Sequence, residues 1–331
     1  MRGAVVAQIR RTRRPLIVSH RNPDPDSLGS ALGLAAIFDA LGASPVLAVS
    51  QPESIDPVMA SIPGSARFHA LTADVLAAPP DGRPFDGLFS VDTASMNLLS
   101  SEGKVRAALG GIRPIVNIDH HVTNERFGDL NYVVSDAAAA AEVIWMLLST
   151  LGGGISREGA IALQAGLVAD TLGFQTRETG PRTLRAAAAL QALGGDTSDV
   201  PRRVLNVRTF EASRLLGAAL AAAVRSEDGR VVWTQVSAEM AAGVGARIAD
   251  SQGIPNALQD VAEAMAVAVF YEMSDSRTRV SLRSQGPRID GVAASFGGGG
   301  HALAAGATVD APLNAATEQV LARMQTVLDG R

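Results

Sequence analysis

The segment SHRNPDPDSLGSALG, residues 19–33, places one histidine and two aspartates between a hydrophobic run and a helical pattern. The run that leads into it, PLIVSH, predicts a buried strand, and the pattern that follows, SLGSALGLAAIFDALG (27–42), predicts a helix. The two prolines inside the segment disfavour a regular helix and keep the backbone extended. His20, Asp24 and Asp26 are therefore expected to project from one short loop at the end of a strand.

Apolar strands alternate with helices through the first 195 residues, and this order predicts an α/β domain with a mainly parallel sheet. The expected strands cover 15–20, 44–50, 86–92 and 113–119, and the expected helices cover 27–42, 136–152, 157–170 and 181–195. A further amphipathic helix is expected before the first strand. We assign residues 1–195 to this first domain.

The second part of the chain has a different order of elements. Residues 196–229 are interpreted as a helical linker, and residues 230–331 predict a smaller α/β domain with a mixed sheet. The expected elements of this domain are a strand (230–237), a helix (238–250), a hairpin (265–284), a short helix (289–296) and a final helix (313–329).

Histidines and aspartates gather where the predicted strands of the first domain end. The carboxyl ends of parallel strands share one edge of a sheet, so side chains far apart in sequence are expected to converge there. Converging carboxylates repel unless a cation neutralises them, and mixed Asp and His ligands suit Mn²⁺, Mg²⁺, Zn²⁺ or Fe²⁺. The candidate ligands are enough for two ions: His20, Asp24, Asp26, Asp92, Asp119, His120, His121, and Asp170 just past a helix.

Each of these residues has a structural explanation when it is taken alone. Asp26 or the serine after it could cap the following helix, and Asp92 and Asp170 could be turn residues. Consecutive residues at a strand end point in different directions, so at most one of His120 and His121 is expected to bind a given ion directly. The coincidence of all the clusters at the ends of predicted elements favours metal binding.

The composition limits the class of protein. The chain has 331 residues, 47% of them hydrophobic, which is enough for two domains with sizeable cores. It has no cysteine, which excludes disulfides and thiolate metal sites. No apolar run reaches the ~20 residues that span a bilayer and no export signal is recognised, so a cytoplasmic protein without membrane contact is expected. A net charge of −4 disfavours long duplex nucleic acid as a partner.

A second candidate site lies in SFGGGGHALAAGA (295–307), where four glycines precede His301. Successive glycines leave backbone N–H groups accessible and allow positive φ, which suits a loop that cradles phosphate. A flexible loop is the alternative, and the histidine directly after the run favours ligand binding. Arg283 offers a bidentate phosphate contact, with a solvated strand arginine as the alternative.

These motifs, in this order, resemble those of the DHH phosphoesterases. SHRNPDPDSLGS is similar to the first motif of that family, VDTAS to the second, IDHHVTN to the third and GLVADTLGF to the fourth. GGGGHALAAG resembles the glycine-rich signature of the associated C-terminal domain, the DHHA1 type. The motifs run from residue 20 to residue 306, and the layout resembles that of bacterial NrnA-like nanoRNases.

The resemblance implies a role for each candidate residue. Two divalent ions, most simply Mn²⁺, would be held by His20, Asp24, Asp26, Asp92, His120 and Asp170, with Asp92 bridging. His121 would face the scissile phosphate, with Asp119 in support as the second catalytic residue. The second domain would bind substrate through Arg283, Gly298, Gly299, Gly300 and His301.

The resemblance also implies the reaction. Hydroxide formed between the two ions would attack phosphorus in the cleft between the domains. Short oligoribonucleotides of two to five nucleotides and linear dinucleotides (pApA, pGpG) would give mononucleotides, and pAp would give AMP. The alternatives are a cyclic di-AMP phosphodiesterase, a pyrophosphatase or exopolyphosphatase, and a non-catalytic nucleotide sensor, which the intact ligand set disfavours. A homodimer is a further expectation from the family.

Overall fold

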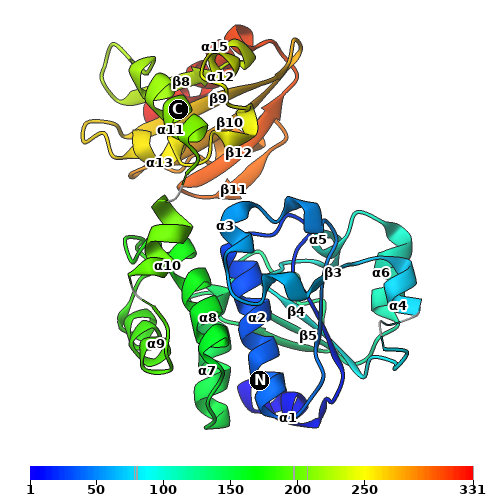
Figure 1. The fold of residues 1–331 in the computed structure, drawn as a ribbon. Coiled ribbons are helices and arrows are strands. Elements are labelled where there is room, and N and C mark those ends of the chain that lie inside the picture. Colours follow the sequence, from blue (N-terminus) through cyan, green and yellow to red (C-terminus); the bar gives the residue numbers. More distant parts are fainter. Residues whose placement is uncertain (78, 80, 197, 207, 331) are drawn as a thin grey trace. The chain divides into compact units, whose positions relative to one another are not determined.

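The structure is a computed structural model that describes residues 1–77, 79, 81–196, 198–206 and 208–330, with the side chains at 201, 206 and 301 outside that description. The chain forms two compact units, Met1–Val207 and Arg208–Arg331 (Figure 1). Each is an α/β unit with its own sheet, which confirms the predicted fold class. Among the described residues, no helix is both long enough and apolar enough to cross a membrane.

The first unit contains a six-stranded sheet in the order β3-β2-β1-β4-β5-β6, and all of its strand pairs are parallel. The strands are β1 (Pro15–Val18), β2 (Val46–Val49), β3 (Phe68–Ala70), β4 (Gly87–Val91), β5 (Ile115–Asp119) and β6 (Leu130–Val133). Strands β3 and β6 were not predicted, because both are short edge strands that are only partly buried and lack an apolar run.

The helices of the first unit occupy most of the predicted ranges. They are α1 (Arg2–Arg11), α2 (Pro25–Ala40), α3 (Pro57–Ala60), α4 (Ala73–Ala77), α5 (Met96–Leu99), α6 (Gly103–Gly110), α7 (Ala140–Leu151), α8 (Arg157–Asp170), α9 (Pro181–Ala192) and α10 (Asp199–Pro201). Short turns of helix are η1 (Pro52–Ser54), η2 (Ser65–Arg67) and η3 (Arg202–Asn206).

Alternate residues of each strand are buried on opposite faces of this sheet, because side chains along a strand point alternately to either side. The face covered by α1, α2, α7 and α8 includes Ile17, Leu47, Phe89, Val116 and Ile118. The face covered by α5 and α6 includes Leu16, Val18, Ala48, Leu88 and Ile115. Figure 1 shows α2 and α8 on one side of the sheet and α4 and α6 on the other.

Helices α2 and α8 approach closely because glycines face the contact. A Cβ atom at Gly29 of α2 would overlap the carbonyl oxygen of Ala162, and one at Gly166 of α8 would lie 2.5 Å from Oδ1 of Asp26. This close contact brings Asp26, in the first turn of α2, next to Asp170, the last residue of α8.

The second unit contains a mixed sheet in the order β11-β12-β10-β9-β8-β7, in which β8 and β9 are parallel and the other pairs antiparallel. The strands are β7 (Val224–Arg225), β8 (Val231–Val236), β9 (Ala266–Ser274), β10 (Arg277–Ser284), β11 (Gly299–His301) and β12 (Ala304–Val309). The helices are α11 (Phe210–Ala221), α12 (Ala238–Gly243), α13 (Ile254–Gln259), α14 (Asp290–Ala294) and α15 (Leu313–Leu328), with the turn η4 (Ile248–Asp250).

One predicted helix of this unit is too long, and one strand was missed. The helix expected over 238–250 ends at Gly243, and Gly245 has a φ of 74°, the left-handed conformation that follows many helix ends. The glycine-rich segment continues into strand β12, which was not predicted because its alanines and glycine are weak strand formers. Helix α11 packs into the core of this unit through Leu215 and Ala219.

Candidate metal centre

The metal-ligand candidates lie where the strand order of the first sheet reverses. Strand β1 lies between β2 and β4, and in such sheets ligands bind beyond the carboxyl ends of the strands at this point. His20 and Asp24 follow β1, Asp92 follows β4, and Asp119 is the last residue of β5. The topology therefore directs three separate segments of the chain to one edge of the sheet.

Helix α2 begins at Pro25, two residues earlier than the sequence suggested. Asp24 is its N-cap, accepting a hydrogen bond from the backbone N–H of Ser27 at 2.8 Å, and the Ser27 hydroxyl accepts one from the Asp24 N–H at 3.0 Å. The expectation that Asp26 or Ser27 caps the helix is wrong, because Pro25 is well tolerated at the first helical position.

Asp26 is fully buried and holds the start of helix α7. Its two carboxylate oxygens accept hydrogen bonds from the backbone N–H groups of Ala140 at 2.6 Å and Ala141 at 3.0 Å. The N-cap residue of α7, Ala139, has no capping side chain, so Asp26 supplies this function from another helix. Burial, reinforced by the charge of Asp92, raises the pKa of Asp26 to about 7.

Asp92 is at the centre of the cluster and is 3% exposed. Its φ of 52° lies in the left-handed region, which is unusual for a residue other than glycine and is often found at functional sites. Nε2 of His20 lies 3.6 Å from Oδ2 of Asp92, and Nε2 of His120 lies 3.5 Å from Oδ1. Oδ1 is buried and has no hydrogen-bond partner among the described residues.

The mutual charges of this cluster shift its pKa values strongly. Burial opposes the charge on His20, but the carboxylates of Asp24 and Asp92 outweigh it and raise the pKa of His20 to about 10. The same competition raises the pKa of His120 to about 11, with Asp92 as its main partner. Burial favours the neutral form of Asp92, but His120 and His20 hold its pKa well below the usual range.

His120 presents one particular nitrogen to the cluster. Its Nδ1 lies 3.2 Å from the carbonyl oxygen of Ala137, which can only accept, so Nδ1 carries the proton in that contact. Nε2 faces Oδ2 of Asp170 at 3.4 Å as well as Asp92. A carbonyl that fixes the tautomer and leaves the other ring nitrogen free to coordinate is the usual arrangement for a metal-binding histidine.

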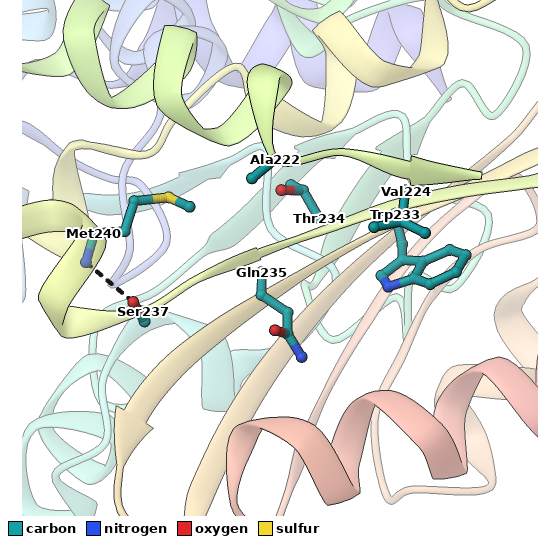
Figure 2. Close-up of a pocket in the computed structure, with 7 residues that line it drawn as sticks. All are labelled: Ala222, Val224, Trp233, Thr234, Gln235, Ser237 and Met240. Carbon is teal, nitrogen blue, oxygen red and sulfur yellow. Dashed lines mark hydrogen bonds between the residues drawn. The ribbon is translucent and has the colours of Figure 1, made fainter.

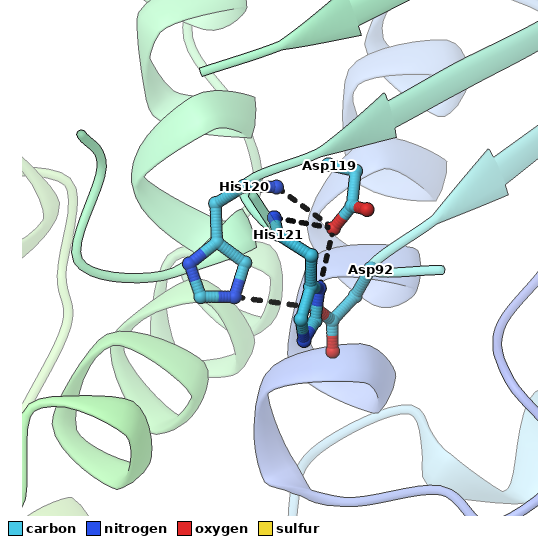
Figure 3. A group of neighbouring side chains, drawn as sticks. All are labelled: Asp92, Asp119, His120 and His121. Atoms are coloured by element: carbon cyan, nitrogen blue, oxygen red, sulfur yellow. Dashed lines mark hydrogen bonds and ion pairs between the residues drawn. The ribbon is translucent and has the colours of Figure 1, made fainter. Parts of the chain in front are cut away.

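Asp119 orients the other histidine of the pair (Figure 3). Its Oδ1 lies 2.8 Å from Nδ1 of His121 and accepts the backbone N–H of His120 at 2.7 Å. Its Oδ2 accepts from Nδ2 of Asn124 at 2.5 Å, and the same amide group donates to Oδ1 of Asn117 at 2.8 Å. Burial disfavours the charge on His121, but the contact with Asp119 outweighs it and raises its pKa.

The two asparagines were not predicted. Asn117 is a buried polar residue in the middle of a strand, and Asn124 lies in the quoted IDHHVTN segment. A polar residue at an apolar strand position was the signal that could have found Asn117. The hydrogen bonds of Asn124 to Asp119 and to Asn117 depend on the fold.

The described residues fit divalent ions. Ligand atoms fall within 4.8 Å of one another in three groups: His20, Asp24 and Asp92; Asp26, His120 and Asp170; and Asp92, Asp119, His120 and His121. The separations of 3.4 to 3.6 Å between imidazole nitrogen and carboxylate oxygen are too long for hydrogen bonds. They suit two ligand atoms that each lie about 2.1 Å from one ion. The unpartnered Oδ1 of Asp92 would gain the partner it lacks.

The substrate residues predicted for the second unit lie together on its sheet. Arg283 of β10 is directly opposite Ala304 of β12, and His301 of β11 is opposite the same alanine from the other side. The side chain of His301 lies outside the described residues. Arg283 donates to the backbone carbonyl of Leu282 at 2.9 Å, and burial lowers its pKa because no described carboxylate pairs with it.

The three predicted glycines have different reasons to be glycine. A Cβ at Gly298 would overlap the backbone of β12, and Gly300 has a φ of 143° and is equally tight against Ala304. Gly299 faces open space. Close backbone packing therefore explains two of them, and the accessible one suits contact with a ligand.

A separate cavity of about 210 Å³ opens beside strand β8 (Figure 2). Its polar side chains already have structural partners: Ser237 accepts the Met240 N–H, and Thr234 donates to the Ala219 carbonyl. The cavity therefore brings no further chemistry to the candidate site.

Comparison with known proteins agrees with this geometry. Residues 14–169 match the DHH family, N-terminal domain, and residues 228–329 match the DHHA1 domain. The bifunctional oligoribonuclease and PAP phosphatase NrnA of Thermus thermophilus is 31% identical over 307 residues, covering 92% of this chain and 87% of that protein. The Bacillus subtilis protein of the same description is 26% identical, covering 88% of this chain and 89% of that one.

A solved structure shows the same fold. The exopolyphosphatase-related protein of Bacteroides fragilis aligns with a TM-score of 0.88 at 23% identity, covering 99% of this chain and 97% of that one. The parallel sheet, the buried Asp–His cluster and the family matches define a phosphoesterase with a candidate site for divalent metal. The chain belongs to the DHH family and carries a C-terminal DHHA1 domain.

Proposed function

We propose that this phosphoesterase hydrolyses short oligoribonucleotides of two to five nucleotides and the linear dinucleotides pApA and pGpG to mononucleotides, and pAp to AMP. The relatives described as oligoribonuclease and PAP phosphatase support this substrate range. We propose Mn²⁺ as the ion, the cytoplasm as the location and a homodimer as the assembly. Long duplex nucleic acid is not expected to bind, because the net charge is −4.

One observation carries the proposal. The buried carboxylate of Asp92, with an unpartnered oxygen, faces imidazole nitrogens of His20, His120 and His121 at 3.5 to 3.6 Å. A buried carboxylate in a strained backbone conformation is costly unless a cation uses it.

The proposed ligands are divided between two ions that share Asp92. One ion would bind His20, Asp24 and Asp92, and the other would bind Asp26, Asp92, His120 and Asp170. Divalent ions bound there supply positive charge for the phosphoryl oxygens and lower the pKa of the attacking water.

The remaining residues move a proton and bind the substrate. Asp119 holds Nδ1 of His121, so Nε2 of His121 is the nitrogen that can reach the reacting phosphate. As a new bond forms between water oxygen and phosphorus, the ester bond to the leaving oxygen breaks, and His121 donates the proton that this oxygen needs. Arg283 and the glycine loop would bind a phosphate that does not react.

A product assay tests the proposal. The purified chain is incubated with pAp, pApA, pGpG, a five-nucleotide RNA, cyclic di-AMP and pyrophosphate, each with Mn²⁺ and with chelator. AMP or GMP released from the first four only with Mn²⁺ is the expected result. Turnover of pyrophosphate but not of pApA would overturn the substrate assignment.

Cyclic di-AMP is the second candidate substrate. The cyclic-di-AMP phosphodiesterase PdeA of Listeria monocytogenes is 25% identical over 91% of this chain, although the match covers only 46% of that protein. Linear pApA as an accumulating product of cyclic di-AMP, rather than a substrate, would favour this alternative.

A further inference from the structure

A groove of about 370 Å³ crosses the sheet of the second unit beyond Arg283. It is lined by Arg279 and Ser281 of β10, Gly306 and Thr308 of β12, and Gly297 and Gly298 of the glycine run. Gly306 has no side chain and lies opposite Ser281, so it leaves the middle of the groove open. The groove therefore shares Gly298 with the proposed phosphate loop and extends away from it along β10.

Arg279 and Arg283 project from the same face of β10. The exposure along the strand alternates, with Arg279, Ser281 and Arg283 more exposed than the residues between them. Four residues of strand separate the two Cα atoms by ~13 Å. The two guanidinium groups therefore lie in a row along one open sheet face.

The guanidinium of Arg279 is held in place but is not neutralised. It lies over the ring of Tyr271, 4.4 Å from the ring centroid, and Tyr271 is its direct cross-strand neighbour. Stacking occupies the face of the guanidinium and leaves its N–H donors directed outward. Within the described part of the chain, no carboxylate pairs with Arg279, whereas Arg277 on the same strand pairs with Asp310 at 3.2 Å.

We propose that Arg279 is a specificity-determining residue that binds a third phosphate of the substrate. This inference rests on the proposed function, in which one phosphate reacts at the metal centre and a second binds Arg283 and the glycine loop. The groove then takes the next nucleotide, and Arg279 binds its phosphate. Arg279 therefore contributes to the affinity for substrates of three nucleotides or more, and not to that for pAp or pApA.

Binding to the two-domain chain tests this inference without relying on turnover. All variants carry His121→Ala, which is expected to keep both ions bound and to slow turnover at least about 100-fold. The affinities for pAp, pApA and pApApA are then measured by titration calorimetry with Mn²⁺ present. Arg279→Gln is expected to lower the affinity for pApApA about tenfold, because one charge-assisted contact is lost. The affinities for pAp and pApA are expected to change less than twofold. Arg277→Gln, the matched control, is expected to leave all three affinities unchanged.

Two more measurements separate a direct contact from a structural effect. Thr308→Glu places a carboxylate directly opposite Arg279, where it can pair with the guanidinium. This variant is expected to lose affinity for pApApA selectively, as Arg279→Gln does. The plot of log affinity for pApApA against log salt concentration has a negative slope. In Arg279→Gln this slope is expected to become shallower by about 0.7, the value for one phosphate contact with a single strand.

The outcomes are distinguishable. An equal loss for all three ligands, or no loss for any, would overturn the role of Arg279. Failure of the wild-type chain to hydrolyse any of them would overturn the proposed function, and the binding series would still report on Arg279.

Discussion

Asp92 concentrates the energetic cost of the site in one residue. Its backbone is in the left-handed region and its carboxylate is buried. Each feature costs free energy unless other interactions in the protein compensate for it. In the metal-free chain, protonated His20 and His120 offset the negative charge. A divalent ion would replace those protons, which makes proton release the direct consequence of metal binding.

The Asp92→Asn variant tests the central ligand. Asparagine tolerates the left-handed conformation and has the same shape, so the fold should persist. We expect loss of bound Mn²⁺ and a fall in kcat of about 10³-fold or more on pApA, because both ions lose a ligand. Metal analysis and kinetics check this, with circular dichroism as the control for folding. Near-normal turnover would remove Asp92 from the chemistry.

His121 should affect the chemical step without affecting metal content. His121→Ala is expected to lower kcat about 10²- to 10⁴-fold, the usual contribution of a general acid, while both ions remain bound. Kinetics combined with metal analysis of the same sample provides the measurement. Loss of an ion in this variant would make His121 a ligand instead.

Among the elements, the contact between α2 and α8 determines how close the proposed ligands Asp26 and Asp170 come. The glycines at this contact allow the helices to approach, and Asp26 of α2 in turn holds the first turn of α7. The proposed ligands from two helices and from the loop after β5 are therefore coupled through packing as well as through charge.

Gly166→Ala tests this coupling. The new methyl group would lie 2.5 Å from Oδ1 of Asp26 and 3.1 Å from Cβ of Ala141. Because the first distance is too short, Asp26 must move. We expect the free energy of unfolding to fall by about 1–3 kcal/mol, as for other overpacked sites, and Mn²⁺ affinity to fall at least about tenfold. Chemical denaturation and metal titration measure the two effects.

Gly217→Ala is the matched control for this prediction. Gly217 is in helix α11, and no heavy atom lies within 4 Å of its added Cβ, so stability should stay level or rise by up to ~1 kcal/mol. Equal behaviour of the two variants would contradict the packing argument.

The sequence predicted those elements that have strong local signals. Buried parallel strands such as β1 and β4 are apolar runs, and the acids and histidines after them were visible from the pattern. Strand β12 and the early end of α12 were missed, because partner strands and a left-handed glycine determine them. The tautomer of His120 depends on the carbonyl of Ala137, seventeen residues away, which no local pattern indicates.

At the scale of the whole molecule, the cluster makes stability depend on pH. Between pH 6.5 and about 10, metal-free folded protein keeps protons on His20 and His120 that the unfolded chain releases. The folded state thus binds more protons, so its free energy of unfolding falls as pH rises through this range. Mn²⁺ binds the deprotonated imidazoles and should stabilise the chain more at high pH than at low pH.

Thermal unfolding at pH 6.5, 8.0 and 9.5, in chelator and in Mn²⁺, measures this linkage. The stabilisation by Mn²⁺ should increase from the lowest pH to the highest. The double variant His20→Asn/His120→Asn should abolish most of that increase. A stabilisation that shrinks as pH rises would contradict the charge distribution described for the site.

The most direct test of the account is a crystal structure of the chain grown with Mn²⁺, with anomalous data collected at the manganese edge. We expect two anomalous peaks in the first unit, both next to the Asp92 carboxylate, one near His20 and Asp24 and the other near Asp26, His120 and Asp170. An anomalous map without peaks at this cluster would contradict the metal centre, and the phosphoesterase mechanism proposed for it would fail with it.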